Sequence, residues 1–230
     1  MPDQLLSPDF IEKLRQIDSP TICNAIEHFQ VRDRTTGYAT NELVCQFPEQ
    51  QPMVGYAVTC TATTTTPGDS RTSRVDKLVE VVEAAPQPSV IVIQQTGHDR
   101  LRTCFLGDLF CTTMRKLGSV GVVTDGNIRD HSGIRQRAPD YQVFAPGRVV
   151  SHGWGVFFDF NVTVTVCGLT IQPGDLLHGD ESGLLTVPID SVEPVLKQAQ
   201  VVLEAEAELL DFLSSERFTM EELKRRFSPH

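Results

Sequence analysis

The sequence predicts an α/β fold made of a single domain, with flanking helices at both termini. A βαβ unit lies in the middle of the chain, where the apolar run Val90–Ile93, an amphipathic helix and the apolar strand Val120–Thr124 follow one another. The C-terminal half contains short segments of alternating apolar and polar residues, which are typical of half-buried strands. The chain has 230 residues and no linker that would divide it, so we expect one domain over residues 1–230.

The N-terminal part, residues 1–30, is expected to contain two helices. Apolar side chains recur at helical spacing in residues 8–16. Ser19 and Pro20 are predicted to be the N-cap and the first residue of the second helix, because serine caps helices and proline is tolerated in their first turn. Residues 31–52 are polar and contain prolines, and we expect them to be irregular.

The middle of the chain supplies further elements around the βαβ unit. Residues 54–66 include a run of β-branched threonines and predict one long strand, and residues 71–84 predict an amphipathic helix. Residues 94–106 are charged and are expected to form a solvated loop. The helix of the βαβ unit runs from Leu106 to Leu117 and should end at Gly118, because glycine readily adopts the left-handed conformation that follows many helices.

The C-terminal third combines short strands with a helical tail. Strands are predicted at 162–167, 169–171, 176–178 and 184–187, with turns at the glycines between them. Residues 189–227 are expected to form C-terminal helices, a long amphipathic one over 189–214 and a short last one. Thr219 and Glu222 have the spacing of a capping box, which predicts where the last helix begins.

The composition excludes several classes of protein. Lys+Arg number 20 and Asp+Glu number 30, so the formal net charge is −10, whereas nucleic-acid binding or polybasic membrane attachment needs a basic surface. We expect neither a nucleic acid nor a membrane as a partner, since the sequence also lacks an apolar run of transmembrane length. The six cysteines form no CxxC pair and the N-terminus is charged, which indicates reduced thiols in a cytoplasmic protein.

Three ionisable residues are placed where one site could form. Asp108 opens the helix of the βαβ unit, and Arg129 and Asp130 follow the next strand, with 20 residues between Asp108 and Arg129. One helix, one turn and one parallel strand take up that spacer. The carboxyl end of a strand and the start of the following helix lie at the same edge of a sheet. We therefore expect these side chains to converge at that edge, where open α/β sheets bind ligands.

These residue types together favour a 2-oxo acid as the ligand. The first-turn amides of Leu109 and Phe110 could hold a carboxylate. Asp130 is a hard oxygen ligand suited to Mg²⁺, which typically binds one or two carboxylates and keeps several waters. Arg129 would place a guanidinium beside the enolate oxygen that develops on carbon–carbon cleavage. Two simpler interpretations remain open. Asp108 would only interact favourably with the positive end of the helix dipole, and Arg129 and Asp130 would only form a salt bridge in a loop.

Three segments of the chain resemble the RraA-like family, in the right order. The segment GDLFCTTMRKLGSVGVVTDGNIRD resembles its signature of an aspartate, a 20-residue spacer and Arg-Asp. SPTICNAIE resembles the N-terminal helix of the family, and VCGLTIQPGDLLHGDESGLLTVP resembles its closing segment. The family includes class II pyruvate aldolases acting on 4-hydroxy-4-methyl-2-oxoglutarate and 4-carboxy-4-hydroxy-2-oxoadipate. The resemblance implies a swivelling β/β/α fold, assembled as a homotrimer or as a homohexamer of two trimers, with active sites near subunit interfaces.

The resemblance also implies a role for each residue of the predicted site. Arg129 matches the substrate-binding arginine, Asp130 the metal-associated aspartate, and Asp108 the carboxylate that positions a water for proton transfer. Leu109 and Phe110 match the positions whose backbone amides hold the pyruvyl carboxylate. The implied catalytic residues are Arg129 and Asp108, the implied metal ligand is Asp130, and the implied substrate-binding residues are Gly107, Leu109, Phe110 and Arg129.

The implied function is that of a lyase dependent on Mg²⁺ or Mn²⁺. It would cleave a small 4-hydroxy-2-oxo acid to pyruvate, and it would decarboxylate oxaloacetate through the same enolate. The alternative is a non-catalytic RraA-type regulator that binds and inhibits a ribonuclease. Gly133 disfavours this alternative, because members that regulate ribonuclease E tend to carry glutamate three residues after the aspartate. Asn24 is a second departure, since many members carry aspartate there.

Overall fold

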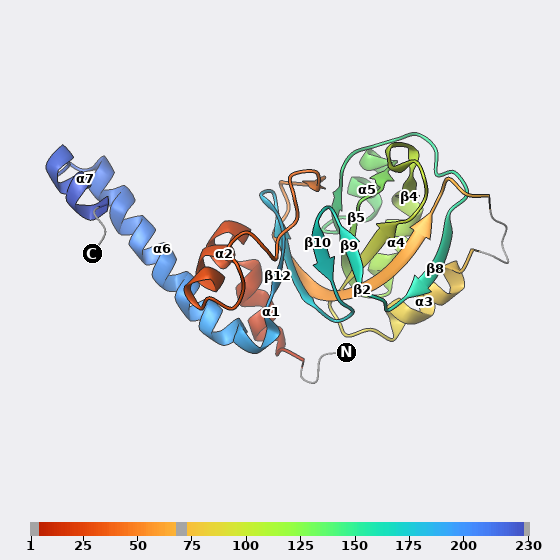
Figure 1. Cartoon of the computed structure of the whole chain (residues 1–230), viewed down its shortest axis with the longest axis horizontal. Coiled ribbons are helices and arrows are strands. Elements are labelled where there is room, and N and C mark those ends of the chain that lie inside the picture. Colours follow the sequence, from red (N-terminus) through yellow and green to blue (C-terminus); the bar gives the residue numbers. More distant parts are fainter. Residues whose placement is uncertain (1–4, 68–72, 228–230) are drawn as a thin grey trace.

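An eight-stranded mixed sheet forms the centre of the fold, with helices on one of its faces and at one of its ends (Figure 1). The computed structural model describes residues 5–67 and 73–227. The strands of the sheet are β1 (Val44–Cys45), β2 (Met53–Thr63), β3 (Ser89–Gln95), β5 (Ser119–Thr124), β7 (Gln142–Ala145), β8 (Val156–Phe160), β11 (Leu176–Asp180) and β12 (Gly183–Val187). They follow the order β1-β7-β5-β3-β2-β11-β12, and β8 pairs with β2 beside this path. β2, β3, β5 and β7 run parallel to one another, whereas the other strands pair antiparallel with their neighbours.

Two smaller ladders accompany the sheet. β9 (Val164–Val166) and β10 (Leu169–Ile171) form an antiparallel hairpin. β4 (Cys104–Leu106) and β6 (Asn127–Ile128) form a short parallel pair. β6 follows the carboxyl end of β5 after a two-residue turn, so this pair continues the chain from the edge of the sheet where ligands are expected.

The helices and the β9–β10 hairpin cover opposite faces of the sheet. The helices on one face are α3 (Val75–Glu83), α4 (Asp108–Lys116) and α5 (His131–Arg137). Residues of β3 alternate between the two sides: Ile91 and Ile93 join the core beneath these helices, whereas Val90 and Val92 join the core beneath the hairpin. The layers are therefore hairpin, sheet and helices, which confirms the β/β/α arrangement that the resemblance implied.

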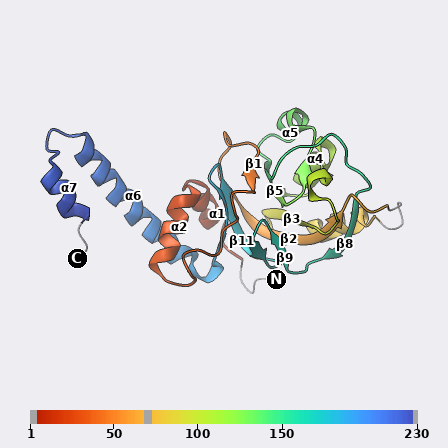
Figure 2. The same ribbon diagram turned by 45° about the horizontal axis from the view of Figure 1, so that its top comes forward.

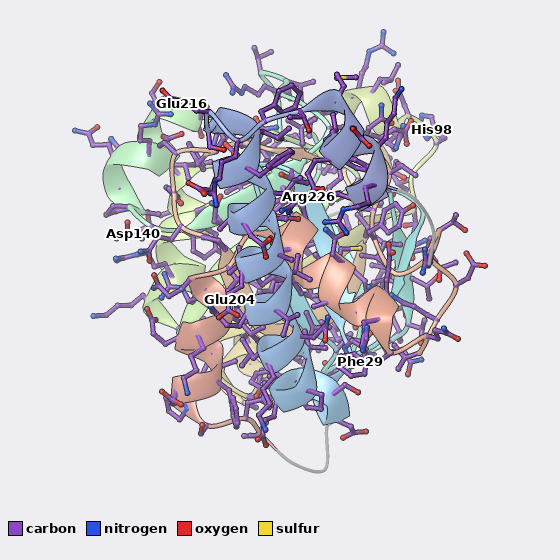
Figure 3. All side chains as sticks on the ribbon, turned by 90° about the vertical axis from the view of Figure 1, so that its left-hand side faces the viewer. Phe29, His98, Asp140, Glu204, Glu216 and Arg226 are labelled. Carbon is purple, nitrogen blue, oxygen red and sulfur yellow. The ribbon has the colours of Figure 1, made fainter. Side chains whose placement is uncertain are left out.

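A third cluster of buried residues joins the two ends of the chain. α1 (Pro8–Arg15), α2 (Ser19–His28) and the first turns of α6 (Val192–Ser214) pack against β11, β12 and the start of β2. A short 3₁₀ helix, η2 (Ile189–Ser191), leads into α6. Beyond α2, α6 extends away from the body, and α7 (Met220–Phe227) folds back beside its distal end (Figures 1 and 2). Figure 3 shows the molecule from the left-hand side of Figure 1, where α6 crosses in front of the N-terminal helices.

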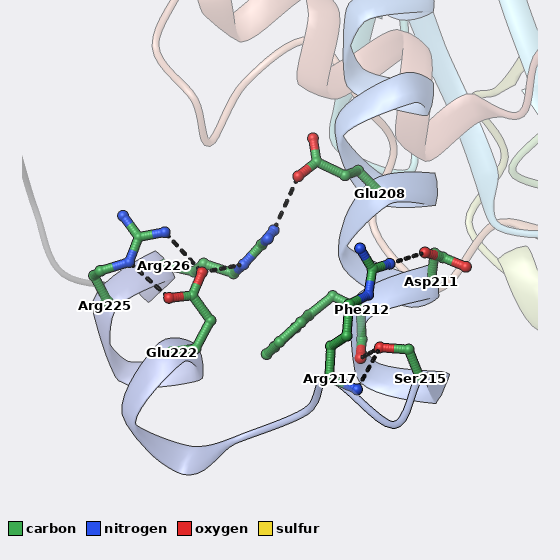
Figure 4. A network of polar contacts seen from close by, with 8 residues as sticks. All are labelled: Glu208, Asp211, Phe212, Ser215, Arg217, Glu222, Arg225 and Arg226. Carbon is green, nitrogen blue, oxygen red and sulfur yellow. Dashed lines mark hydrogen bonds and ion pairs between the residues drawn. The ribbon is translucent and has the colours of Figure 1, made fainter.

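Side-chain contacts tie α7 to the distal part of α6 (Figure 4). The ring centroids of Phe212 and Phe218 are 5.7 Å apart. The guanidinium of Arg226 lies 4.6 Å from the centre of the Phe212 ring and pairs with Glu208 at 3.2 Å and Glu222 at 3.0 Å. These contacts connect α7 to the distal part of α6. The two together form a helical arm, which is joined to the body through the first turns of α6.

The second N-terminal helix begins one residue earlier than predicted. Asp18 is its N-cap, and its Oδ1 accepts a hydrogen bond from the amide of Thr21 at 2.9 Å. Ser19 lies inside the helix: its amide donates to Asp180 Oδ2 at 2.6 Å, and its hydroxyl is 2.9 Å from His178 Nδ1. The prediction of Ser19 as the cap was wrong, because Asp18 makes the capping bond while Ser19 is taken up by buried contacts with β11.

Several other boundaries also differ from the prediction. β2 ends at Thr63 rather than at residue 66, and the predicted loop 94–106 contains both β4 and a 3₁₀ helix, η1 (Arg100–Arg102). The predicted helix over 71–84 begins at Val75, and residues 71 and 72 lie outside the described residues. Gly118 follows α4 with φ +95°, as predicted. Besides β4, five strands and helices had not been predicted: β1, β6, β7, β8 and α5.

Two further findings concern the cysteines and the helices. All six cysteines are unpaired, and five of them are buried. Within residues 5–67 and 73–227, no helix combines the length and the apolar character needed to cross a membrane. Only one half of the predicted capping box is seen: the hydroxyl of Thr219 accepts a hydrogen bond from the amide of Glu222 at 3.2 Å, whereas the Glu222 carboxylate pairs with Arg225 and Arg226.

Candidate active site

The β4–β6 ladder brings the predicted site residues together. β4 leads directly into Gly107 and Asp108, and β6 leads into Arg129 and Asp130. The two strands are parallel, and the amide of Arg129 donates to the carbonyl of Leu106 at 3.0 Å. The convergence expected from the 20-residue spacer is thus present. The two segments that carry the site residues are aligned by the short β4–β6 ladder and not by strands of the larger sheet. β4 lies within the segment that was predicted to be a loop.

A pocket of about 280 Å³ opens where these two strands end. Every predicted site residue lines it: Gly107, Asp108, Leu109, Phe110, Arg129 and Asp130. The sequence analysis missed the rest of its described lining, which consists of Val75, Cys104, Phe105, Leu106, His152, Trp154, Gly155 and Phe157. The lining therefore combines a few charged side chains with many apolar ones.

Gly107 lets the charged side chains approach the backbone. A Cβ atom at this position would clash with Asp130 Oδ2 and would stand 3.2 Å from Arg129 Cγ. The reason for glycine here is space, because its φ of −138° is open to any residue. Arg129 and Asp130 can therefore lie directly against the start of α4.

Arg129 and Asp130 form an ion pair that faces the pocket. Arg129 Nε lies 3.3 Å from Asp130 Oδ2, and about two fifths of each side chain is exposed (37% and 40%). Asp130 has a left-handed backbone with φ +54°, a conformation that aspartate tolerates better than most residues. It occupies the N-cap position of α5 but makes no capping bond with its side chain. The salt-bridge interpretation is correct as geometry, and the carboxylate remains accessible to a ligand.

The Asp108 carboxylate is held by two donors. Its Oδ1 accepts the amide of Leu109 at 2.7 Å, and its Oδ2 pairs with Arg137 from α5. Gly133 makes room for this pair, since a Cβ atom there would stand 2.9 Å from Asp108 Oδ2. The amide of Leu109, predicted to bind a substrate carboxylate, thus donates within the chain. Phe110 carries another amide of this first turn, where helix amides lack helical carbonyl partners.

Sequence analysis had missed Arg137 because α5 itself was missed. This seven-residue helix buries only Ile134, so it shows no apolar stripe to predict it. The 29-residue separation between Asp108 and Arg137 gives no local signal either. The ion pair between Asp108 and Arg137 is therefore apparent only from the three-dimensional structure.

The segment from His152 to Gly155 forms part of the pocket wall. The amide of Trp154 donates to the carbonyl of Thr64 at 3.0 Å. Gly153 and Gly155 both have left-handed backbones, with φ +54° and +59°, and a Cβ atom at Gly153 would clash with the same Thr64 carbonyl. The only tryptophan of the chain, between two glycines, was the available sequence signal for this segment. These contacts fix Trp154 at the pocket while its side chain stays 57% exposed.

Cys104 lines the pocket but is suited neither to nucleophilic chemistry nor to metal binding. Burial raises the pKa of its thiol above the ordinary value, and the nearby Arg129 only partly opposes this effect. Its Sγ donates to the carbonyl of Leu106 at 3.6 Å. The protonated thiol is a weak nucleophile, and the other ionisable side chains of the lining are Asp108, Arg129, Asp130 and His152.

The two arginines of the segment 94–106 lie outside the pocket. In the segment 94–106, Arg100 pairs with Glu42 at 3.0 Å and Arg102 with Asp99 at 2.7 Å. Neither arginine lines the pocket, whereas Cys104–Leu106 of the same segment form β4 and do line it, so the prediction of a solvated loop holds only for the charged part of the segment. Among the described residues there is also no cluster of three or more His, Cys, Asp or Glu side chains that could hold a metal ion. A metal at this site would therefore be bound through Asp130 and water.

Comparison with known proteins identifies the family. The family model for RraA-like proteins, described as Aldolase/RraA, matches residues 19–186. The chain belongs to the RraA-like family. A relative of this RraA-like chain from Halalkalibacterium halodurans, named "Putative 4-hydroxy-4-methyl-2-oxoglutarate aldolase", is 30% identical over 195 residues, which are 84% of this chain and 82% of the relative. A protein of the same name from Pseudomonas fluorescens is 35% identical over 111 residues, covering 47% of this chain and 65% of that protein.

Several relatives of the RraA-like chain are longer than the part they share with it. Protein DlpA from Legionella pneumophila is 28% identical over 134 residues, which are 57% of this chain and 21% of DlpA. An uncharacterised protein from Methanocaldococcus jannaschii is 29% identical over 120 residues, which are 57% of that protein. The chain thus spans between about a fifth and two thirds of the length of these relatives and of the Pseudomonas protein.

Solved structures share the RraA-like fold. An uncharacterised protein from Pseudomonas syringae superposes with a TM-score of 0.74 at 23% identity, covering 99% of this chain and 98% of the other. RraAS2 from Streptomyces coelicolor, described as an unusual member of the RNase ES inhibitor RraA protein family, superposes with a TM-score of 0.69 at 21% identity, over 90% of this chain and 98% of the other. At these identities the likeness establishes the fold alone.

Proposed function

We propose that this chain is a metal-dependent lyase that cleaves a 4-hydroxy-2-oxo acid to release pyruvate, with decarboxylation of oxaloacetate as a related activity. The observation that carries the proposal is the meeting of Asp108, Arg129 and Asp130 with the first turn of α4 in one pocket. Relatives named for 4-hydroxy-4-methyl-2-oxoglutarate cleavage support the same reaction class.

The accessible carboxylate of Asp130 fits a divalent cation. Asp130 presents one accessible carboxylate, and Mg²⁺ or Mn²⁺ is often held by one or two carboxylates together with water. When bound, such an ion would supply Lewis-acid polarisation of the 2-oxo group. Asp130 would be its ligand from this chain, and the neighbouring Arg129 guanidinium would orient the Asp130 carboxylate through their ion pair.

Arg129 and Asp108 would supply charge stabilisation and proton transfer. Arg129 places a fixed cation where negative charge develops on the 2-oxo oxygen as the carbon–carbon bond breaks. The Asp108 carboxylate, held by Leu109 and Arg137, would take the proton of the 4-hydroxyl through a bound water. Decarboxylation of oxaloacetate forms the same enolate but removes no hydroxyl proton, so it would need Arg129 more than Asp108.

We also propose that the chain assembles as a homotrimer or homohexamer in the cytoplasm. Leu109 lies at the pocket and is 79% exposed, so a ligand or a neighbouring subunit has access to it. A neighbouring subunit lying over this residue would bury it. Such an arrangement would place each active site near a subunit interface.

The test compares both reactions in three variants. Arg129→Ala should lower kcat/KM for aldol cleavage and for decarboxylation alike, by about 10²–10³. Arg129→Lys should recover only part, because a point charge does not reproduce the guanidinium fork. Asp108→Asn should damage aldol cleavage far more than decarboxylation. Release of pyruvate is followed by a coupled assay with Mg²⁺ and then with EDTA.

Two outcomes of this test would count against the proposal. Equal losses of both activities in Asp108→Asn would refute its role in proton transfer. Complete lack of metal-dependent pyruvate release by the wild-type chain would refute the lyase. It would instead favour the alternative of a non-catalytic regulator that binds and inhibits a ribonuclease.

A further inference from the structure

His152 lines the pocket of the candidate active site and is not used by the proposed reaction. It belongs to the connection between β7 and β8, whereas Asp108, Arg129 and Asp130 follow β4 and β6. Its side chain is exposed and makes no hydrogen bond, ion pair or ring contact with any described residue. Both ring nitrogens are therefore available to a ligand, and at least one of them carries a proton that can be donated.

Thr64 fixes the backbone beside His152 relative to β4. Thr64 is buried, and its hydroxyl accepts a hydrogen bond from the amide of Cys104 at 3.2 Å. Its carbonyl accepts a second hydrogen bond, from the amide of Trp154 at 3.0 Å. Cys104 begins β4, the strand that leads to Asp108. One buried residue thus ties the segment that carries His152 to the strand that leads into the charged part of the lining.

The backbone next to His152 is also constrained locally. Gly153 has a left-handed conformation with φ +54°, and a Cβ atom there would clash with the carbonyl of Thr64, so only glycine fits. The amide of Gly153 donates to the hydroxyl of Ser151 at 3.2 Å. The backbone therefore holds the imidazole of His152 at the pocket, while its ring nitrogens stay available.

We propose that His152 binds the second carboxylate of a dicarboxylic 4-hydroxy-2-oxo acid, at the end of the substrate remote from the 2-oxo group. The inference rests on the proposed function and names a residue that recognises this end. Relatives named for 4-hydroxy-4-methyl-2-oxoglutarate, which is such a diacid, support the class. In the proposed reaction Arg129 serves the 2-oxo end. A second carboxylate that enters the pocket is costly unless it is hydrogen-bonded, and an imidazole N–H supplies such a bond.

A binding test uses two 2-oxo acids that lack the 4-hydroxyl and differ only at C5. 2-Oxoglutarate carries a carboxylate there and 2-oxopentanoate carries a methyl group, and each is titrated by calorimetry in the presence of Mg²⁺. His152→Ala should weaken 2-oxoglutarate binding by about 10-fold or more, because a hydrogen bond to a charged group is lost. It should change 2-oxopentanoate binding by less than about 2-fold. His152→Gln keeps an N–H donor and should recover part of the affinity for 2-oxoglutarate.

A kinetic test uses two substrates that differ in the same way. 4-Hydroxy-4-methyl-2-oxoglutarate would be cleaved to two molecules of pyruvate, and 4-hydroxy-4-methyl-2-oxopentanoate to pyruvate and acetone. His152→Ala should lower kcat/KM for the diacid by about 10-fold or more, mainly through KM, and leave the monoacid nearly unchanged. His98→Ala is the matched control, because His98 is also exposed but lies outside the pocket, and it should change neither substrate.

The outcomes distinguish this inference from the proposed lyase. Equal effects of His152→Ala on the diacid and the monoacid of either pair would indicate proton transfer, metal binding or local structure, and would overturn the inference. An unchanged affinity for 2-oxoglutarate would overturn it as well. Both results leave the lyase standing when the wild-type chain releases pyruvate. Selective weakening of 2-oxoglutarate binding without any pyruvate release by the wild-type chain would remove the lyase while leaving His152 as a carboxylate-binding residue.

Discussion

Gly133→Ala should abolish most of the activity while leaving the stability of the fold nearly unchanged. The new Cβ atom would stand 2.9 Å from Asp108 Oδ2 and 3.0 Å from Arg137 Nη1, so the Asp108–Arg137 pair must shift or separate. A displacement of about 1 Å at a catalytic group commonly lowers the rate about 10²-fold. We therefore expect kcat/KM for aldol cleavage to fall about 100-fold.

The stability terms oppose each other in this variant. Replacing glycine by alanine within a helix stabilises it by about 0.5–1 kcal/mol. Losing an ion pair whose arginine is 59% exposed costs about 0.2–1 kcal/mol after solvent screening. The free energy of unfolding should thus change by less than about 0.5 kcal/mol, which corresponds to a Tm shift of about 2 °C or less.

The assay pairs pyruvate release with thermal unfolding of the same preparations. Ser132→Ala is the matched control, since Ser132 is an exposed neighbour on α5 outside the pocket, and it should keep full activity. Arg137→Ala removes the cation without crowding and should also lower activity. Full kcat/KM in a folded Gly133→Ala protein would refute the idea that the position of the Asp108 carboxylate matters for the reaction.

Three further outcomes are expected. The Asp130→Ala variant should lose activity at every Mg²⁺ concentration, and its free energy of unfolding should change by about 0.5 kcal/mol or less. Retained Mg²⁺-dependent activity would contradict the metal assignment. Burial lowers the pKa of His178 below its ordinary value of 6.5, so the native state binds fewer protons than the unfolded chain. The free energy of unfolding should therefore decrease as pH falls below about 6.5, and a flat urea-unfolding profile between about pH 8 and pH 5 would speak against this. Light scattering should give three or six times 25.5 kDa, and a monomer at micromolar concentration would argue against an interface site.

The sequence predicted the elements that carry strong periodicity. The apolar run of β3 and the 3.6-residue repeat of α4 were sufficient for the βαβ unit, and Gly118 marked its helix end because few other residues adopt that backbone. α5, β1 and β6 were missed because each is short and owes its conformation to contacts distant in the sequence. The choice between Asp18 and Ser19 as a cap could not be made locally, since both side chains can accept the same amide.

The charged half of the site was predictable and the apolar half was not. Asp108, Arg129 and Asp130 are marked by their types and by a spacer of one βαβ crossover. Trp154 and Phe157 come from a later connection and strand, where an apolar residue is equally consistent with ordinary core packing. Only the pairing of β8 with β2 shows that this part of the chain returns to the ends of β4 and β6.

The two parts of α6 differ in how strongly they resist local unfolding. The first turns of α6 bury Val192, Val195 and Ala199 against the body, whereas Phe212 is the only buried residue in the rest of that helix. The distal turns depend on their own backbone hydrogen bonds, on the contacts of Phe212 with Phe218 and Arg226, and on the ion pair between Glu208 and Arg226. Local unfolding can therefore release the end of α6 together with α7 as a separate cooperative unit, while the amides around the pocket stay protected from hydrogen exchange.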